Sequence, residues 1–333
     1  MAIEQVNFDI LTPTYRRSDT FLPDCIESVR SQPDEVDGVQ IGYRHIVVNV
    51  DRKDEAATSY LESESRKDAR LLTETYRGAR HTQNIGLNVA CGISAENYGI
   101  RRDAGSFVAS HVIMVDDDDM LAENTLGHYA RAIVEDPRRE LIFGKLALID
   151  EHGTPIDDSS SDIAYNDVPY TTDAAVFMEQ MLQANHIPRS AAIGHLAMIT
   201  SGSFSPDIIC LDWHAYARII RSGAPYHMID EVTDIYRQHA MQISRQHRAN
   251  GAWELAAQRL RQDYASGNMP TAPNFPISSM EYATGESVGE LTDGRIDSGM
   301  RFIDDPHHGP TIVFSEKPQS RNLGILRNYR PVA

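Results

Sequence analysis

The sequence predicts an α/β protein with a Rossmann-like, mostly parallel sheet that is flanked by helices. Near the N-terminus, a strand pattern at 6–11 precedes a helical pattern with apolar residues at 22, 26 and 29, and a second strand pattern covers 43–50. Strand, helix and strand at this spacing form a βαβ unit, which implies parallel strands and a right-handed crossover. Farther along, the apolar run 111–115 leads into four consecutive aspartates. Open α/β sheets bind their ligands at such strand ends.

Composition excludes several classes of protein. The 333 residues are 41% hydrophobic and 24% charged, as in ordinary globular proteins. The net charge of -17 argues against nucleic acid and anionic membrane surfaces as partners. We expect no transmembrane segment and no signal peptide, because no apolar run approaches about 18 residues and the N-terminus lacks a basic and an apolar region. Three widely spaced cysteines, Cys25, Cys91 and Cys210, are typical of a reduced, cytoplasmic protein.

The remaining elements are expected to alternate along the chain. Apolar periodicity and capping residues predict helices at 61–75, 94–110, 125–134, 174–184, 212–221 and 251–264, and strands at 141–149, 191–200 and 228–236. The polar stretch 151–172 is expected to be a long connection. From Met269 onward prolines and glycines are frequent, and only 311–315 has a strand pattern. We therefore expect two halves of one main domain, 1–150 and 151–265, and an irregular C-terminal extension, 266–333, that wraps the domain or bridges the subunits of a homo-oligomer.

The acidic run Asp116–Asp119 is the strongest candidate site. Four aspartates cannot be buried as free anions, because moving one such charge into the interior costs several kcal/mol unless a partner compensates it. In an extended chain, alternation would turn Asp116 and Asp118 to one side and Asp117 and Asp119 to the other. Two carboxylates that converge on one point suit a hard divalent cation carrying phosphate oxygens. The alternative is an acidic turn that only stays hydrated.

Five short motifs occur in a characteristic order between residues 6 and 245. They are Ile10-Leu11-Thr12-Pro13-Thr14-Tyr15-Arg16-Arg17 with the following Ser28-Val29-Arg30-Ser31-Gln32, then Arg101-Arg102-Asp103-Ala104-Gly105, Val115-Asp116-Asp117-Asp118-Asp119, Leu211-Asp212-Trp213 and Ile235-Tyr236-Arg237-Gln238-His239. Together they resemble the motifs of family 2 glycosyltransferases, an inverting, nucleotide-sugar-dependent group with the GT-A fold. The resemblance implies that 1–150 binds the nucleotide-sugar donor and that 151–265 binds the acceptor.

The resemblance also implies a set of donor-binding residues. Thr12, Pro13, Thr14 and Arg16 would flank the nucleobase at the end of the first strand. Asp51, at the end of the second strand, would accept a hydrogen bond from a uracil imide, although a helix N-cap explains an aspartate there equally simply. Arg102, Asp116 and Asp117 would contact the ribose and the phosphates. Uracil is the family's commonest base, so the expected donor is a UDP-sugar.

Catalytic and metal-binding roles follow from the same resemblance. Asp212 would be the general base that deprotonates an acceptor hydroxyl of a saccharide, a lipid-linked molecule or a small molecule. Asp118 would bind Mn²⁺ or Mg²⁺, with His239 as a further metal or phosphate contact. Asp212 as a helix cap and His239 as a structural histidine are the alternatives. The chain departs from the family pattern at Leu211, where the family often has glutamate, and at the turn 51–54, which has few small residues.

Other functions are compatible with parts of the sequence. A phosphotransferase or phosphatase with an Asp-x-Asp nucleophile usually has threonine or valine two residues after the second aspartate and carries the motif on its first strand; Met120 stands at that position here. A sugar nucleotidyltransferase would have a glycine-rich loop after the first strand, and 13–17 contains no glycine. A non-catalytic protein that binds a nucleotide-sugar or a cation on the same fold remains an alternative.

Overall fold

The computed structural model describes residues 5–14, 20–49, 54–75, 109–157, 171–194, 197, 211–267, 269, 300–305 and 309–314. Within them the strands are β1 (Gln5–Thr14), β2 (Glu35–Val36), β3 (Val39–Asn49), β4 (Leu71–Thr75), β5 (His111–Met114), β6 (Met120–Leu121), β7 (Leu141–Ile149), β8 (Ala192–Gly194), β9 (Tyr226–Arg237), β10 (Met300–Asp305) and β11 (Gly309–Phe314). The helices are α1 (Leu22–Arg30), α2 (Glu55–Lys67), α4 (Thr125–Glu135), α5 (Ala174–Met181), α7 (Leu211–Arg221), α8 (Ile243–Ala249) and α9 (Ala252–Ala265).

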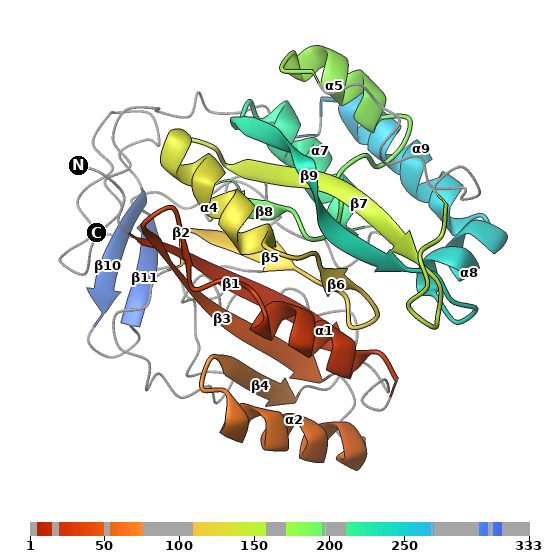
Figure 1. The fold of residues 1–333 in the computed structure, drawn as a ribbon. Helices are drawn as coiled ribbons and strands as arrows, with labels where there is room; N and C mark the ends of the chain where they lie inside the picture. Colours follow the sequence, from red (N-terminus) through yellow and green to blue (C-terminus); the bar gives the residue numbers. More distant parts are fainter. Residues whose placement is uncertain are drawn as a thin grey trace.

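A large mixed sheet organises the molecule (Figure 1). Its strand order is β2-β3-β1-β5-β8-β7-β9-β6, and β4 also pairs with β3, on the edge that faces away from β1. The first half of the chain forms parallel pairs, β1 with β3, β1 with β5 and β3 with β4. The second half enters through the antiparallel strand β8, which lies between β5 and β7. The predicted α/β class and the βαβ unit are confirmed, and antiparallel pairs make the complete sheet mixed.

Alternating side chains supply a core on each face of the sheet. Phe8 and Ile10 of β1 belong to the cluster that α1 and α4 cover, whereas Leu11 belongs to the cluster under α5, α7 and α9. The same alternation separates Ile113 from Val112 and Met114 on β5. Strands buried on both faces read as continuous apolar runs, which is why the run before the aspartates was recognisable in the sequence.

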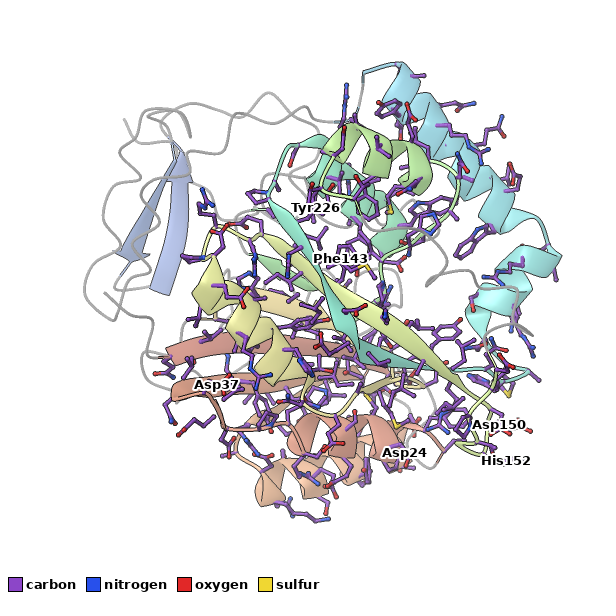
Figure 2. The ribbon with its side chains drawn as sticks, turned by 45° about the horizontal axis from the view of Figure 1, so that its top comes forward. Asp24, Asp37, Phe143, Asp150, His152 and Tyr226 are labelled. Carbon is purple, nitrogen blue, oxygen red and sulfur yellow. The ribbon has the colours of Figure 1, made fainter. Side chains whose placement is uncertain are left out.

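The helices on the second face are anchored by aromatic side chains. Trp213 of α7 is fully buried, donates its indole N–H to the carbonyl of Met181 at 2.6 Å, and stacks on Trp253 of α9 with ring centroids 5.6 Å apart. Phe177 of α5 stacks between Phe143 and Tyr226, at centroid distances of 5.9 and 5.1 Å. Figure 2 labels Phe143 and Tyr226, where β7 and β9 pass α5. These contacts fix α7, which carries Asp212, against the sheet.

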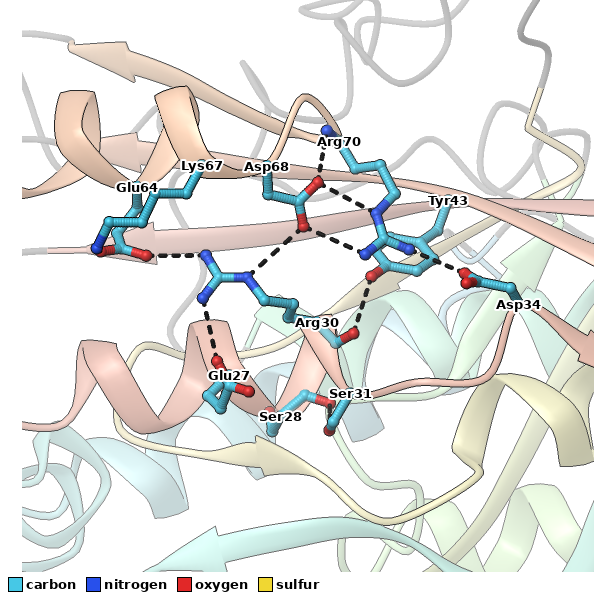
Figure 3. A network of polar contacts seen from close by, with 10 residues as sticks. All are labelled: Glu27, Ser28, Arg30, Ser31, Asp34, Tyr43, Glu64, Lys67, Asp68 and Arg70. Atoms are coloured by element: carbon cyan, nitrogen blue, oxygen red, sulfur yellow. Dashed lines mark hydrogen bonds and ion pairs between the residues drawn. The ribbon is translucent and has the colours of Figure 1, made fainter.

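A surface network of charges joins α1 to α2 and to the turn before β4 (Figure 3). Arg30 contacts Glu27, Glu64 and Asp68 at 3.0, 2.8 and 3.6 Å, and Arg70 bonds Asp68 and lies over the ring of Tyr43. Partly exposed ion pairs stabilise little individually, but a shared network orders long side chains more effectively than isolated pairs. The network holds α2 beside the strand edge that the parallel β3–β4 pair forms.

Several predicted elements need correction. The helix expected at 61–75 is α2, which ends at Lys67, and 71–75 is strand β4; Asp68 is extended and Leu71 is buried beside β3. Among the described residues of the strand expected at 191–200, Ala192–Gly194 form a strand and Ala197 is helical. Strand β10 was not expected beside β11. Most of the helix predicted at 94–110 and of the connection 151–172 lies outside the described residues.

The other predicted helices and strands are confirmed within a few residues. The long strand β9 contains the predicted 228–236, and α7 and α9 match 212–221 and 251–264. Gly223 has a φ of 77°, as expected for the residue that follows α7. Among the described helices, none combines the length and the apolar character that a membrane span requires.

The close approach of β7 to β9 depends on Gly144. The register between the two strands shifts at this residue, and a Cβ atom there would lie 2.5 Å from the carbonyl oxygen of Glu231 and from Cγ2 of Thr233. We expect Gly144→Ala to lower the free energy of unfolding by about 1–3 kcal/mol, the usual cost of overpacking. Lys145→Ala is the neighbouring control, because its ion pair with the exposed Asp230 is on the surface. Urea denaturation with equal stability for the two variants would contradict this account.

Candidate active site

The candidate site lies where β1, β5 and β9 end and β8 begins. Parallel pairing brings the carboxyl ends of β1 and β5 to one edge. Because β8 is antiparallel to β5, with Ile113 opposite Ala192, continuing that register brings Asp116 opposite Arg189. The end of β9 joins them, since β6 follows the aspartates directly and Met120 pairs with Ile235. Segments that are far apart in the chain therefore meet at the acidic run.

The acidic run is a tight turn. Strand β5 ends at Met114, and the N–H of Asp119 donates to the carbonyl of Asp116 at 3.1 Å. Carboxylate oxygens of Asp116, Asp118 and Asp119 all lie within 4.8 Å of one another. The expected alternation, with Asp119 facing away from Asp116 and Asp118, is therefore wrong, because the extended geometry that it assumed stops before the first aspartate. Of the four aspartates in the run, Asp117 is the one outside this cluster.

Asp117 and Asp119 are buried, and neighbouring groups make this tolerable. Asp117 accepts the hydroxyl of Thr14 at 2.8 Å, and Asp119 accepts the backbone N–H of Arg237 at 2.9 Å. Burial, and then the charges of Asp118, Asp234 and Asp116, raise the pKa of Asp119 well above its usual value. A carboxylate cluster with this excess of negative charge favours a bound cation. Charge-bearing oxygens are the ligands that hard divalent cations prefer, so the cluster fits Mn²⁺ or Mg²⁺.

Arg237 braces the turn from the end of β9. Its side chain is 3% exposed; Nε donates to the carbonyl of Asp118 at 3.2 Å and Nη2 contacts Asp24 at 2.7 Å. On the other side, α1 holds the residues that follow the turn. The hydroxyl of Ser28 accepts the N–H of Leu121 at 3.1 Å, and Gln32 bonds the segment that leads into α4. These contacts fix the main chain at Asp118 and in the segment that follows the turn.

His239 lies against Asp118. Its Nε2 is 2.9 Å from Oδ2 of Asp118, its Nδ1 accepts the N–H of Met241 at 3.3 Å, and its ring packs on Phe21 with centroids 4.8 Å apart. An Nδ1 atom that accepts a hydrogen bond places the ring proton of the neutral imidazole on Nε2, and this assignment follows from the contacts. In this arrangement His239 orients Asp118 by donating to it, so its nitrogen lone pair does not point at the cluster.

Asp212 is connected to the cluster through Arg189. It is in the first turn of α7, with Oδ2 3.4 Å from the amide of Asn185 and Oδ1 3.9 Å from Nη1 of Arg189. Arg189 also lies 2.9 Å from Oδ1 of Asp116 through its Nε. One guanidinium therefore links the predicted base to the acidic turn, and the side chain of Asp212 is 18% exposed, so it is accessible to a ligand.

The structure places the other predicted residues as follows. Thr12 is buried, with its hydroxyl 2.9 Å from Nε2 of His45 and near Cys25 under α1. Thr14 is buried and bonded to Asp117, and Pro13 beside it is half-buried at the end of β1. The remaining predicted donor-binding residues, Arg16, Asp51 and Arg102, lie outside the described residues.

Sequence reasoning missed Arg189, Asn185 and the part that Asp119 takes in the cluster. Arg189 follows a proline and precedes the apolar run of β8, so a lone arginine between buried segments was the available signal. Arginines at such positions are buried only when they are paired. Without the antiparallel register of β8, however, the sequence did not indicate which carboxylates pair with it.

Comparison with known proteins found no matching family model and no matching curated protein. Solved structures with partial similarity include S. aureus TarS 1-349 in complex with UDP-GlcNAc, with 14% identity and a TM-score of 0.49 over 71% of this chain and 60% of that one. The mannosyltransferase PcManGT from Pyrobaculum calidifontis in complex with GDP-Man and Mn²⁺ has 14% identity and a TM-score of 0.49 over 80% and 65%. GalNAc-T7 with UDP, GalNAc and Mn²⁺ has 11% identity and a TM-score of 0.48, over 71% of this chain and 44% of that one. The chain thus spans about 60% of the TarS fragment's length.

The Thr14–Asp117 hydrogen bond gives a test of how the acidic turn is held. Thr14→Val keeps the shape of the side chain but removes the hydroxyl from a buried carboxylate, and we expect a loss of about 1–3 kcal/mol in the free energy of unfolding. Thr14→Ser retains the donor and is the matched control. Chemical denaturation of the two variants and the wild type measures the difference. If valine and serine cost the same, the hydroxyl does not stabilise the turn.

Proposed function

We propose that the protein is an inverting glycosyltransferase of the GT-A type that moves a sugar from a nucleoside-diphosphate donor, with UDP-sugars favoured, to an acceptor hydroxyl. The observation that supports this most is the placement of Asp212 across from the cluster of Asp116, Asp118 and Asp119, with Arg189 between them. A cation-binding cluster at a sheet edge suits a diphosphate, and a separate carboxylate facing it suits a general base.

The donor half of the proposal concerns charge. A nucleoside diphosphate adds anionic oxygens to a protein with a net charge of -17 and to a cluster of three carboxylates. One like-charge pair at about 4 Å costs on the order of 4 kcal/mol at an effective dielectric constant near 20, so the carboxylates alone would repel the donor. A bound divalent cation would supply the missing positive charge and would stabilise the departing diphosphate. Asp116, Asp118 and Asp119 would hold it, and His239 would orient Asp118.

The acceptor half concerns Asp212. In the proposed step, its carboxylate takes the proton of the acceptor hydroxyl, the acceptor oxygen bonds to the anomeric carbon, and the bond from that carbon to the diphosphate oxygen breaks on the opposite face. Inversion needs one base and no covalent intermediate. Asn185 and Arg189 each contact one oxygen of Asp212, and such contacts fix a carboxylate in one orientation.

A non-catalytic protein that binds the same donor is the second candidate, because Leu211 stands where the family often has glutamate next to the base. The two candidates differ in one measurable property. A transferase hydrolyses its donor slowly when water replaces the acceptor, whereas a binding protein releases the donor intact. Release of UDP from a panel of UDP-sugars in the presence of Mn²⁺ therefore tests the proposed function directly.

Nucleotide binding is expected to require the cation. Calorimetric titration with UDP should show strong binding in Mn²⁺ and little in EDTA for the wild type, because the cation offsets the repulsion of the carboxylates. In the Asp118→Asn variant, the affinity for UDP should differ little between Mn²⁺ and EDTA. Asp230→Asn, at a side chain that is 92% exposed, is the control and should behave as the wild type does. Equal affinity with and without Mn²⁺ would refute the metal-binding role.

Turnover is expected to depend on Asp212. Asp212→Asn keeps the size of the side chain but removes the proton acceptor, and we expect donor turnover to fall by about 10²-fold or more, as when general base catalysis is removed. The affinity for UDP should stay near the wild-type value. Asp263→Asn, which breaks an ion pair with Arg259 within α9, is the matched control. Unchanged turnover in the Asp212 variant would assign the base to another residue.

A further inference from the structure

The segment that carries Arg189 is held by buried side chains from three elements. The hydroxyl of Tyr216, on α7, donates to the carbonyls of Pro188 and Arg189 at 3.3 and 3.1 Å. The hydroxyl of Tyr129, on α4, donates to the carbonyl of Ser190 at 3.0 Å. The N–H of Ser190 donates to Oδ2 of Asp234, on β9, at 3.0 Å. Both tyrosines are fully buried, so this backbone is fixed in place.

The side chain of Arg189 is correspondingly confined. It is 14% exposed and lies between Asp116, at 2.9 Å from Nε, and Asp212, at 3.9 Å from Nη1. The contact with Asp116 is an ion pair without hydrogen-bond alignment, because the buried Nε has no hydrogen-bond acceptor among the described residues. A guanidinium stays charged at every physiological pH. The fixed backbone and the two carboxylates therefore hold a permanent positive charge between the acidic turn and α7.

We propose that Arg189 is the internal counter-ion of the site: it positions Asp212 relative to the acidic turn, and it competes with a divalent cation for Asp116. The positioning part rests on the proposed function, because it assumes that Asp212 is the base. The competition part rests only on the contacts of Arg189 and on the carboxylate cluster. Arg189 is thus a positioning residue for Asp212 and sets the cation affinity of the cluster.

The competition has a consequence that can be measured without substrate. Removing the guanidinium leaves three carboxylates with one positive charge fewer beside them, which favours an added cation. Arg189→Gln should therefore bind Mn²⁺ more tightly than the wild type in the absence of nucleotide, by about tenfold. Arg189→Lys keeps a positive charge, on an ammonium group in place of the guanidinium, and its Mn²⁺ affinity should lie close to that of the wild type. The enlarged affinity is the opposite of what general damage to the site would produce.

The first experiment titrates the full-length chain with Mn²⁺ and follows the free ion by electron paramagnetic resonance. Arg44→Gln is the matched control, because it also removes an arginine from a buried carboxylate, Asp9 at 2.7 Å, in the middle of β1 and β3. It should leave Mn²⁺ affinity unchanged. Equal Mn²⁺ affinity in the wild type and in Arg189→Gln would overturn the proposal.

A second variant covers the case in which Arg189→Gln does not fold. Tyr216→Phe keeps the buried ring but removes the two hydrogen bonds to the Arg189 segment. It should shift Mn²⁺ affinity in the same direction by a smaller factor, since the guanidinium is then less firmly held. An unchanged or weakened Mn²⁺ affinity in this variant would contradict the role of the hydrogen bonds between Tyr216 and the Arg189 segment.

Chemical rescue tests the positioning of Asp212. Arg189→Ala should release UDP from its donor with a lower kcat and a nearly unchanged KM, and added guanidinium should restore part of kcat. An increase in KM alone, or no rescue, would overturn the positioning role. The failure of the proposed function has a different signature: a wild-type protein that never cleaves a donor would refute the transferase, while a Mn²⁺ affinity that still depends on Arg189 would leave the counter-ion in place.

Discussion

The concentration of carboxylates after β5 is the constraint on which the rest of the site depends. Asp117 and Asp119 are buried within a run of four aspartates, and each buried charge costs several kcal/mol unless partners compensate it. Asp117 accepts a hydroxyl from β1, Asp119 accepts a backbone N–H from the end of β9, and the guanidinium of Arg189, from the segment before β8, lies against the neighbouring Asp116. The strands and loops around the turn therefore supply the groups that offset the cost of burying its carboxylates.

These contacts do not fully offset the negative charge of the aspartates, and the remaining charge is what suits the site to a cation. Hydrogen bonds from Thr14 and Arg237 offset the burial of individual carboxylates, but the pKa of Asp119 remains raised well above its usual value by burial and by neighbouring charges. A site that was fully neutralised by its own side chains would gain little from a cation. On the proposed function, the three oxygens within 4.8 Å of one another would hold an added dication, and an anionic diphosphate would then become an acceptable ligand.

The sequence predicted the parts of this arrangement that depend on local pattern. The βαβ unit, the buried strand before the aspartates and the positions of α7 and β9 follow from periodicity, and all are present. What failed depends on contacts between distant segments. The residues 61–75 are rich in helix-forming charged residues, yet Leu71 begins a strand because β3 offers it a parallel partner. The geometry of the aspartates was misread since an extended chain was assumed, and Arg189 was missed because the antiparallel register of β8 leaves no trace in the local sequence.

The position of Arg189 links the two halves of the proposed reaction. The donor side needs positive charge, whereas the acceptor side needs an anion that stays in one place and accepts a proton. A single guanidinium that contacts Asp116 and Asp212 serves both needs, and its backbone is tied to α4, α7 and β9 by buried hydrogen bonds. If an added cation takes over Asp116, the guanidinium keeps Asp212 as its remaining partner. The donor side and the acceptor side of the proposed site are thus coupled through one side chain.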